Sequence, residues 1–295
     1  MPEVFPLELE REIFEIVARS STKLIPPLLR VARRVKVWIE PLLYPVIVFC
    51  DPLPGHVSFS FPGLLDTLSS QPPGFAAEHI RHLFLPYTVL ERETRVARLL
   101  AICSGVQDLV LMNTPMPRDL GPFRLGLLAK MPLTRLCVSA KNLFAPGPVD
   151  FTHALFAHVT HLDLLDEVRG SWDTRWAGLA LIPRLTHLAF EISMSGSWGW
   201  ENVIYGALKH CPKLQVLALM WSPWLRDTMR QNQYEDKIGR LADSDPRFVI
   251  VLQASYTHDW EAGARGGIDA WSRAEQLVGQ SAAARSAGLL SEGTQ

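Results

Sequence analysis

One short pattern recurs six times through the middle of the sequence. Each copy has the frame apolar, any, any, apolar, any, apolar, and successive copies are separated by 26, 27, 26, 26 and 29 residues. Random clusters of apolar residues would not keep this spacing, so the pattern indicates a structural repeat. Short runs of this kind predict β-strands, and apolar runs at 44–49 and 248–252 extend the series at its two ends. The six repeats begin at Ile80, Val106, Leu133, Val159, Leu185 and Leu214.

Amphipathic stretches between the expected strands predict helices. A proline stands just before three of the strands, where it ends the preceding helix because it cannot continue the hydrogen-bonded ladder. Each repeat is therefore expected to contain one strand and one helix, which is an α/β arrangement. The expected helices cover residues 90–102, 125–131, 176–182 and 200–211.

A strand and a helix within about 26 residues resemble the unit of a leucine-rich-repeat solenoid. The stretch 207–219 is similar to the cysteine-containing repeats of F-box proteins. The Asn or Cys that this family places after the strand is mostly absent here, with Asn113 and Asn142 as loose candidates. We therefore expect an irregular solenoid over residues 46–255, in which stacked repeats bury the apolar face that one repeat cannot bury alone.

Two amphipathic helices are predicted before the repeats, over residues 5–18 and 24–40. Acidic side chains in the first turn of the earlier helix complement the positive end of its dipole, and Pro41 ends the later one. Each helix has apolar residues at helical spacing, which form one face. These are Leu9, Ile13, Ile16 and Val17 in the first helix, and Leu28, Val31, Val35 and Trp38 in the second.

Residues 1–45 resemble an F-box. The family begins with an apolar residue, Pro, any residue, Glu and Leu, with Ile four residues later. Here these are Phe5, Pro6, Glu8, Leu9 and Ile13. The second half of the family's pattern has a Val, a small residue and two basic residues, and residues 31–34 match it. Val35 stands where the family has Trp. An F-box-like module before leucine-rich-like repeats, with a tail motif at 259–275, resembles the large fungal families of F-box-like proteins.

This resemblance implies the substrate receptor of a Skp–cullin–RING ubiquitin ligase. Its helical module would dock on the Skp-type adaptor, while the repeats hold a protein substrate that the sequence does not identify. Packing of the same helix face against the first repeat is the structural alternative. The functional alternative is an interaction scaffold with a degenerate F-box that does not bind the adaptor, which Val35 motivates. The predicted adaptor contacts are Pro6, Leu9, Ile13, Leu28, Val31 and Trp38.

Polar side chains occupy the strand positions that face the concave side of such a solenoid. Solenoids bind partners on that side, so these residues are predicted to recognise a protein partner. His161, Asp163 and His187 are also competent zinc ligands, but they lack a local spacing motif, and we expect a polar ladder or partner surface without a metal. The predicted partner-binding residues are His82, Asp108, Arg135, His161, Asp163 and His187.

The end of the chain is expected to close the solenoid. Ile268, Trp271, Ala274 and Val278 are spaced as one helix face, which predicts a helix over the last repeat within a capping segment at 256–280. Residues 281–295 are rich in Ala, Ser and Gly and are predicted to form a flexible tail.

Composition and motifs favour some classes of function over others. The chain has 29 basic and 30 acidic residues, a net charge of −1 that does not favour nucleic-acid binding. It contains no nucleophile, phosphate-loop or dinucleotide motif, so we expect neither an enzyme nor a cofactor. The longest apolar run, at 42–50, is too short to span a membrane. The start has no leader pattern, which predicts a cytoplasmic or nuclear protein.

Overall fold

The sheet contains eight parallel strands in sequence order, β1 to β8. The computed structural model describes residues 5–86, 93–112, 121–168, 171–191, 200–221 and 234–286. The six strands predicted from the repeat are confirmed, as are the two added by the flanking apolar runs. Their bounds are β1 Val46–Val48, β2 His82–Leu85, β3 Asp108–Leu111, β4 Arg135–Val138, β5 His161–Leu164, β6 His187–Glu191, β7 Val216–Trp221 and β8 Phe248–Leu252.

The repeat frame sets the register between strands. Its central apolar residue pairs with the same position of the next strand, as in Leu83 with Leu109 and Leu162 with Leu188. These leucines are fully buried and belong to the largest core cluster. The periodicity of the sequence therefore becomes a continuous apolar row along one face of the sheet.

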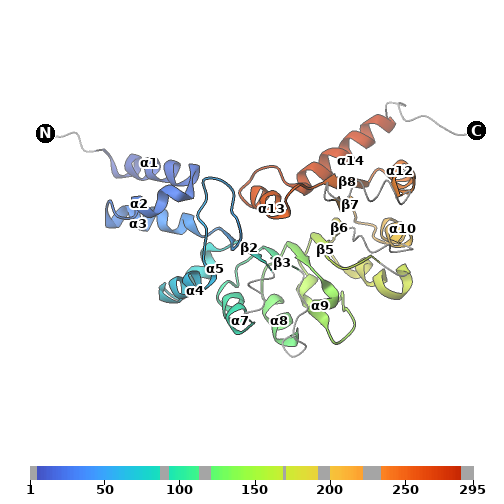
Figure 1. Ribbon diagram of the computed structural model, residues 1–295, viewed down its shortest axis with the longest axis horizontal. Helices are drawn as coiled ribbons and strands as arrows, with labels where there is room; N and C mark the ends of the chain where they lie inside the picture. Colours follow the sequence, from blue (N-terminus) through green and yellow to red (C-terminus); the bar gives the residue numbers. More distant parts are fainter. Residues whose placement is uncertain are drawn as a thin grey trace, which may run out of the picture.

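Helices and short helical turns cover the outer face of the curved sheet, on the side of this leucine row (Figure 1). The predicted helix at 176–182 is wrong: the chain there forms one wide π turn and one 3₁₀ turn, in which the indole rings of Trp172 and Trp176 are both buried. The start predicted at 90 lies outside the described residues. The outer elements are α4 Phe61–Ser70, α5 Phe75–His79, α7 Glu93–Ile102, α8 Gly121–Leu128, α9 Ala140–Phe144, η3 Ala154–Phe156, η4 Trp172–Trp176, η5 Ala177–Leu181, α10 Trp200–His210 and α12 Tyr234–Ser244.

Threonine hydroxyls satisfy backbone groups where the family's Asn is missing. The side chains of Thr134, Thr160 and Thr186 donate to carbonyl oxygens of the preceding repeat, at distances of 3.1–3.2 Å. Asn113 lies outside the described residues, and Asn142 lies within α9. The irregular array therefore has its own side-chain ladder, and it is visible in the sequence as a Thr before three of the strands.

The N-terminal module contains α1 Leu7–Ser20, α2 Ile25–Leu28 and α3 Arg33–Ile39, with short 3₁₀ turns η1 Thr22–Leu24 and η2 Glu40–Leu43. Arg34 of α3 forms a bidentate ion pair with Glu10 of α1. The continuous helix predicted at 24–40 is wrong, because Ala32 has an extended backbone and separates α2 from α3. Leu28, Val31, Val35 and Trp38 consequently do not form the predicted face: Val35 is fully buried, whereas Val31 is 60% exposed.

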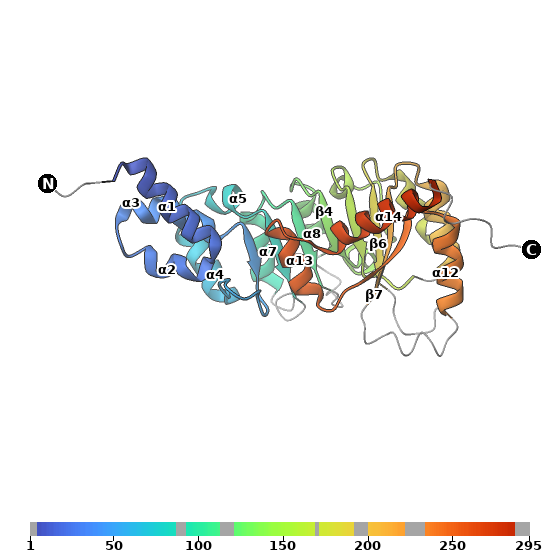
Figure 2. The same ribbon diagram turned by 90° about the horizontal axis from the view of Figure 1, so that it is seen from above.

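The C-terminal segment, defined here as residues 256–286, lies across the inner face of the sheet (Figures 1 and 2). It contains two helices, α13 Tyr256–Ala264 and α14 Ala270–Ser286, where one capping segment was predicted at 256–280. Ala270 and Ala274 belong to one buried cluster with Ala189 and Ala218, and α14 packs mainly against strands β7 and β8. The helix continues beyond the predicted start of the tail at 281, and residues 287–295 are outside the described part.

Among the residues that the structure describes, no helix combines the length and the apolar character needed to cross a bilayer.

Candidate functional site

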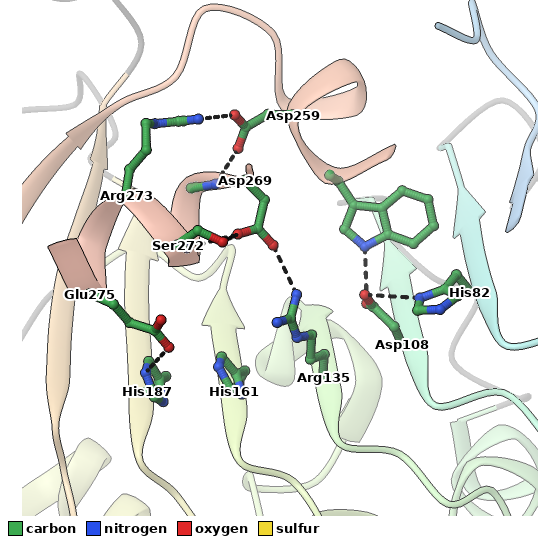
Figure 3. A network of polar contacts seen from close by, with 12 residues as sticks. His82, Asp108, Arg135, His161, His187, Asp259, Asp269, Ser272, Arg273 and Glu275 are labelled. Carbon is green, nitrogen blue, oxygen red and sulfur yellow. Dashed lines mark hydrogen bonds and ion pairs between the residues drawn. The ribbon is translucent and has the colours of Figure 1, made fainter. Parts of the chain in front are cut away.

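The six predicted partner-binding residues lie together on the inner face, and we call them the inner strip. Five of them occupy equivalent positions of β2 to β6, and the strand register pairs each with the next. Asp163 lies two residues beyond His161 on the same side of β5. Figure 3 shows most of these side chains pointing toward the C-terminal segment. The inner strip comprises His82, Asp108, Arg135, His161, Asp163 and His187.

At one end of the inner strip, Asp108 binds the C-terminal segment through Trp260. The indole Nε1 donates to the Asp108 carboxylate at 3.0 Å, and His82 lies 3.5 Å from the other carboxylate oxygen. Asp108 is only 4% exposed, so its carboxylate needs a donor from the protein, and the indole supplies one. The Trp260 ring also contacts Phe84, at 5.4 Å between ring centroids.

Arg135 continues the strip with an ion pair to Asp269, in which Nη1 and Oδ2 are 2.8 Å apart. Asp269 immediately precedes α14 and accepts from the backbone and hydroxyl of Ser272, so it caps the helix as well. Asp259 accepts from the Ala270 backbone N–H. These contacts fix the start of α14 above the middle of the sheet.

Asp163 is held by Tyr256, whose hydroxyl donates to its carboxylate at 2.8 Å. Burial raises the pKa of Asp163 to about 6, partly opposed by the hydrogen bonds from Tyr256 and Cys137. Burial also raises the pKa of the Tyr256 hydroxyl well above its ordinary value, so that this group stays protonated and acts as a donor.

The two histidines at the other end of the strip are stacked. Their ring centroids are 4.0 Å apart, with 10° between the ring planes, and Trp271 lies edge-on to both. His187 Nε2 is 3.2 Å from Glu275 Oε1 of α14. Burial, with a smaller contribution from His187, lowers the pKa of His161 to about 3. Burial also lowers the pKa of His187, although Glu275 opposes the shift. Both imidazoles are therefore neutral near pH 7.

The sequence predicted the strand residues of this contact region but missed the residues of the C-terminal segment that face them. The structure brings the six inner-strip residues together as predicted, but each of them contacts the chain's own C-terminal segment. Asp108, Asp163 and His187 are buried beneath the segment, whereas His82, Arg135 and His161 remain partly exposed. The missed residues lie within the tail motif at 259–275 or just before it, where aromatic and acidic side chains are interspersed. They are Tyr256, Trp260, Asp269, Trp271 and Glu275.

Little space remains between the inner strip and the C-terminal segment. The cavity there has a volume of about 30 Å³, which is the size of a water molecule and far below that of a small-molecule site. A second hollow, of about 500 Å³, opens on the outer side between α4, α5 and α7, and Arg98 is the charged side chain among its described lining residues.

A second surface lies on the N-terminal module, where α1 presents apolar side chains to solvent. Leu9, Ile13 and Ile16 are 47%, 49% and 60% exposed, although they form the apolar stripe of the helix. The helix instead packs on the module through Ala18, which is fully buried, and through the partly buried Phe14. The face predicted for the adaptor is therefore open rather than part of the core.

The six predicted adaptor contacts differ in exposure. Pro6, Leu9, Ile13 and Val31 are exposed. Leu28 and Trp38, on either side of the break at Ala32, are half-buried and pack against the core. Any docking surface on this module is thus centred on α1.

Fold and site together define a solenoid of parallel strand–helix repeats whose inner face is closed by its own C-terminal helices. No family model matches the chain, and no curated protein matches it. Among solved structures, the chain is similar to the leucine-rich repeat-containing protein LegL7 from Legionella pneumophila, with 18% identity over 75% of this chain and 69% of the other and a TM-score of 0.39.

Proposed function

We propose that the protein is a non-catalytic protein-interaction module that docks through the exposed face of α1. The observation that carries this proposal is the exposure of Leu9, Ile13 and Ile16, three large apolar side chains on consecutive turns of one helix. Exposed apolar stripes of this kind mark surfaces that a partner covers, since leaving them in water forgoes the gain of burial. Phe5 and Leu7, 66% and 59% exposed, extend the stripe toward the N-terminus.

The partner that fits best is a Skp-type adaptor of a cullin–RING ubiquitin ligase. Support comes from the F-box-like pattern of the module, in which Leu9 and Ile13 are motif residues and are also exposed. Under this proposal the solenoid selects a protein substrate, and the inner strip takes part when the C-terminal segment moves aside. Val35 favours the alternative of a scaffold that has lost adaptor binding, because it stands at the family's Trp position and is fully buried.

Calorimetric titration of the full chain with the purified Skp-type adaptor tests the proposal. We expect binding at micromolar affinity or tighter. Leu9→Asp should weaken it by at least about thirtyfold, as expected for a central apolar contact worth ~2 kcal/mol, without changing the circular dichroism. Leu181→Asp is the matched control, because Leu181 is 61% exposed and belongs to the outer turn η5.

The outcomes separate the two candidate functions. Loss of binding in Leu9→Asp with retention in Leu181→Asp supports the ligase-receptor function. Absence of binding by the unmodified chain overturns it and leaves the scaffold alternative. Unfolding of Leu9→Asp would show that the stripe belongs to the core, against its exposure in the structure.

A further inference from the structure

The stacked histidines of the inner strip are held by neighbouring threonines. Thr160 Oγ1 lies 2.9 Å from His161 Nδ1, and Thr186 Oγ1 lies 2.8 Å from His187 Nδ1. Each hydroxyl has one proton, which it donates to the carbonyl oxygen of the preceding repeat. The hydroxyl oxygen therefore accepts from Nδ1–H of the ring. This arrangement assigns the proton of each neutral imidazole to Nδ1 and leaves a lone pair on Nε2.

Both of these Nε2 atoms are buried and have no hydrogen-bond partner among the described residues. His187 Nε2 lies 3.2 Å from Glu275 Oε1, although the two atoms are not aligned as a hydrogen bond. An unprotonated ring nitrogen and a carboxylate oxygen are both acceptors, and two acceptors at this distance repel each other. A cation between them removes the repulsion.

The three acceptor atoms have the composition and spacing of a metal site. His161 Nε2, His187 Nε2 and a Glu275 carboxylate oxygen all lie within 4.8 Å of one another. Ligands of a tetrahedral zinc ion are about 3.3 Å apart, given Zn–N and Zn–O bonds of ~2.0–2.1 Å. His187 Nε2 and Glu275 Oε1, 3.2 Å apart, already have this spacing, and the Glu275 side chain, 56% exposed, has room to move. Figure 3 shows Glu275 directed from α14 toward His187.

The surroundings are compatible with a cation. Arg135 is the nearest positive side chain on the strip, and its ion pair with Asp269 compensates its charge. Trp271 packs edge-on against both rings, with centroid distances of 5.2 and 5.7 Å, and restricts their rotation. Hydrogen bonds that orient the ligating imidazoles, here from Nδ1–H to threonine, are the usual second layer of a metal site.

We propose that His161 Nε2, His187 Nε2 and Glu275 bind a divalent transition metal ion, with zinc as the best match. Two imidazoles and one carboxylate suit zinc, whereas calcium and magnesium prefer oxygen ligands alone. Water completes the coordination. The ion joins β5 and β6 to α14, so its consequence is to lock the C-terminal segment over the inner face. This proposal does not depend on adaptor binding.

Isothermal titration of the metal-free full chain with zinc chloride tests the site. We expect one equivalent bound at micromolar affinity. Glu275→Gln keeps the size of the side chain and should weaken binding by about tenfold or more, while His161→Gln with His187→Gln should abolish it. His82→Gln is the matched control, because His82 lies on the same strip but outside the cluster, and it should bind zinc as the unmodified chain does.

Two further measurements distinguish a built site from chance binding. Thr186→Val removes only the orienting hydroxyl and should weaken zinc binding by about 10-fold to 100-fold, the usual effect of a lost second-layer partner. Zinc at a fixed concentration should raise the thermal midpoint of the unmodified chain more than that of Glu275→Gln, whose exposed side chain contributes little to folding without metal. Binding weaker than about 100 µM, or equal loss in His82→Gln, would overturn the proposal.

Discussion

The hydrogen bond between Trp260 and Asp108 should contribute measurably to holding the C-terminal segment on the sheet. Trp260→Phe keeps an aromatic ring beside Phe84 but removes the N–H that lies 3.0 Å from the carboxylate. A hydrogen bond to a charged group contributes about 1.5–3 kcal/mol. Asp108 is 4% exposed, but Trp260 is only half-buried, so water can partly replace the donor. We therefore expect a destabilisation near the lower end, about 1.5 kcal/mol.

A double-mutant cycle isolates this contact from the change of ring shape. Trp260→Phe, Asp108→Ala and the double variant are compared by denaturant unfolding, and the coupling energy should be about 1.5 kcal/mol. Hydrogen exchange follows the segment itself: backbone amides of α13 should exchange about tenfold faster in Trp260→Phe. A coupling energy below about 0.5 kcal/mol, the usual error of additivity, would show that this hydrogen bond does not fasten the segment.

Three other predictions test the packing of the solenoid. Leu162→Ala opens the buried leucine row at its centre and should cost about 2–5 kcal/mol in a denaturant titration; a cost under ~1 kcal/mol, as expected for a surface position, would contradict that row. Gly206→Ala should lower the free energy of unfolding by about 1–3 kcal/mol, because the added methyl meets the Trp172 ring. Gly126 of α8 faces open space, so Gly126→Ala should raise it by about 0.5–1 kcal/mol. Burial raises the pKa of the Cys103 thiol to about 12. Cys103 should therefore not react with a thiol reagent at pH 8 until denaturant is added. Modification of Cys103 in native buffer, measured by mass spectrometry, would refute this.

The sequence alone determined the repeat, the strands and the face on which each strand residue lies. A period of about 26 residues with a fixed apolar frame admits few packings, because each strand must bury its leucines against its own helix and pair with its neighbours. The register follows from the same frame, so His82, Asp108, Arg135, His161 and His187 could be placed in one row before any coordinates were known. These are local properties repeated along the chain.

Where the chain breaks local periodicity, the sequence pattern failed. The spacing of Leu28, Val31, Val35 and Trp38 predicts one helix face, but the extended backbone at Ala32 separates two short helices and sends Val35 into the core. The stripe on α1 is ambiguous from sequence for a similar reason. Periodicity shows that Leu9, Ile13 and Ile16 share a face, but only the packing of the neighbouring helices decides whether that face is covered.

The tertiary structure alone decided what covers the inner face. Nothing in the spacing of the repeats brings Trp260, Asp269 or Glu275 to the strands, because contacts between residues so far apart in sequence depend on where the end of the chain folds back. The small inner-face residues Ala189 and Ala218 share a buried cluster with Ala270 and Ala274 of α14. The sequence thus determined the row of polar side chains. The fold determined that the C-terminal segment covers this row.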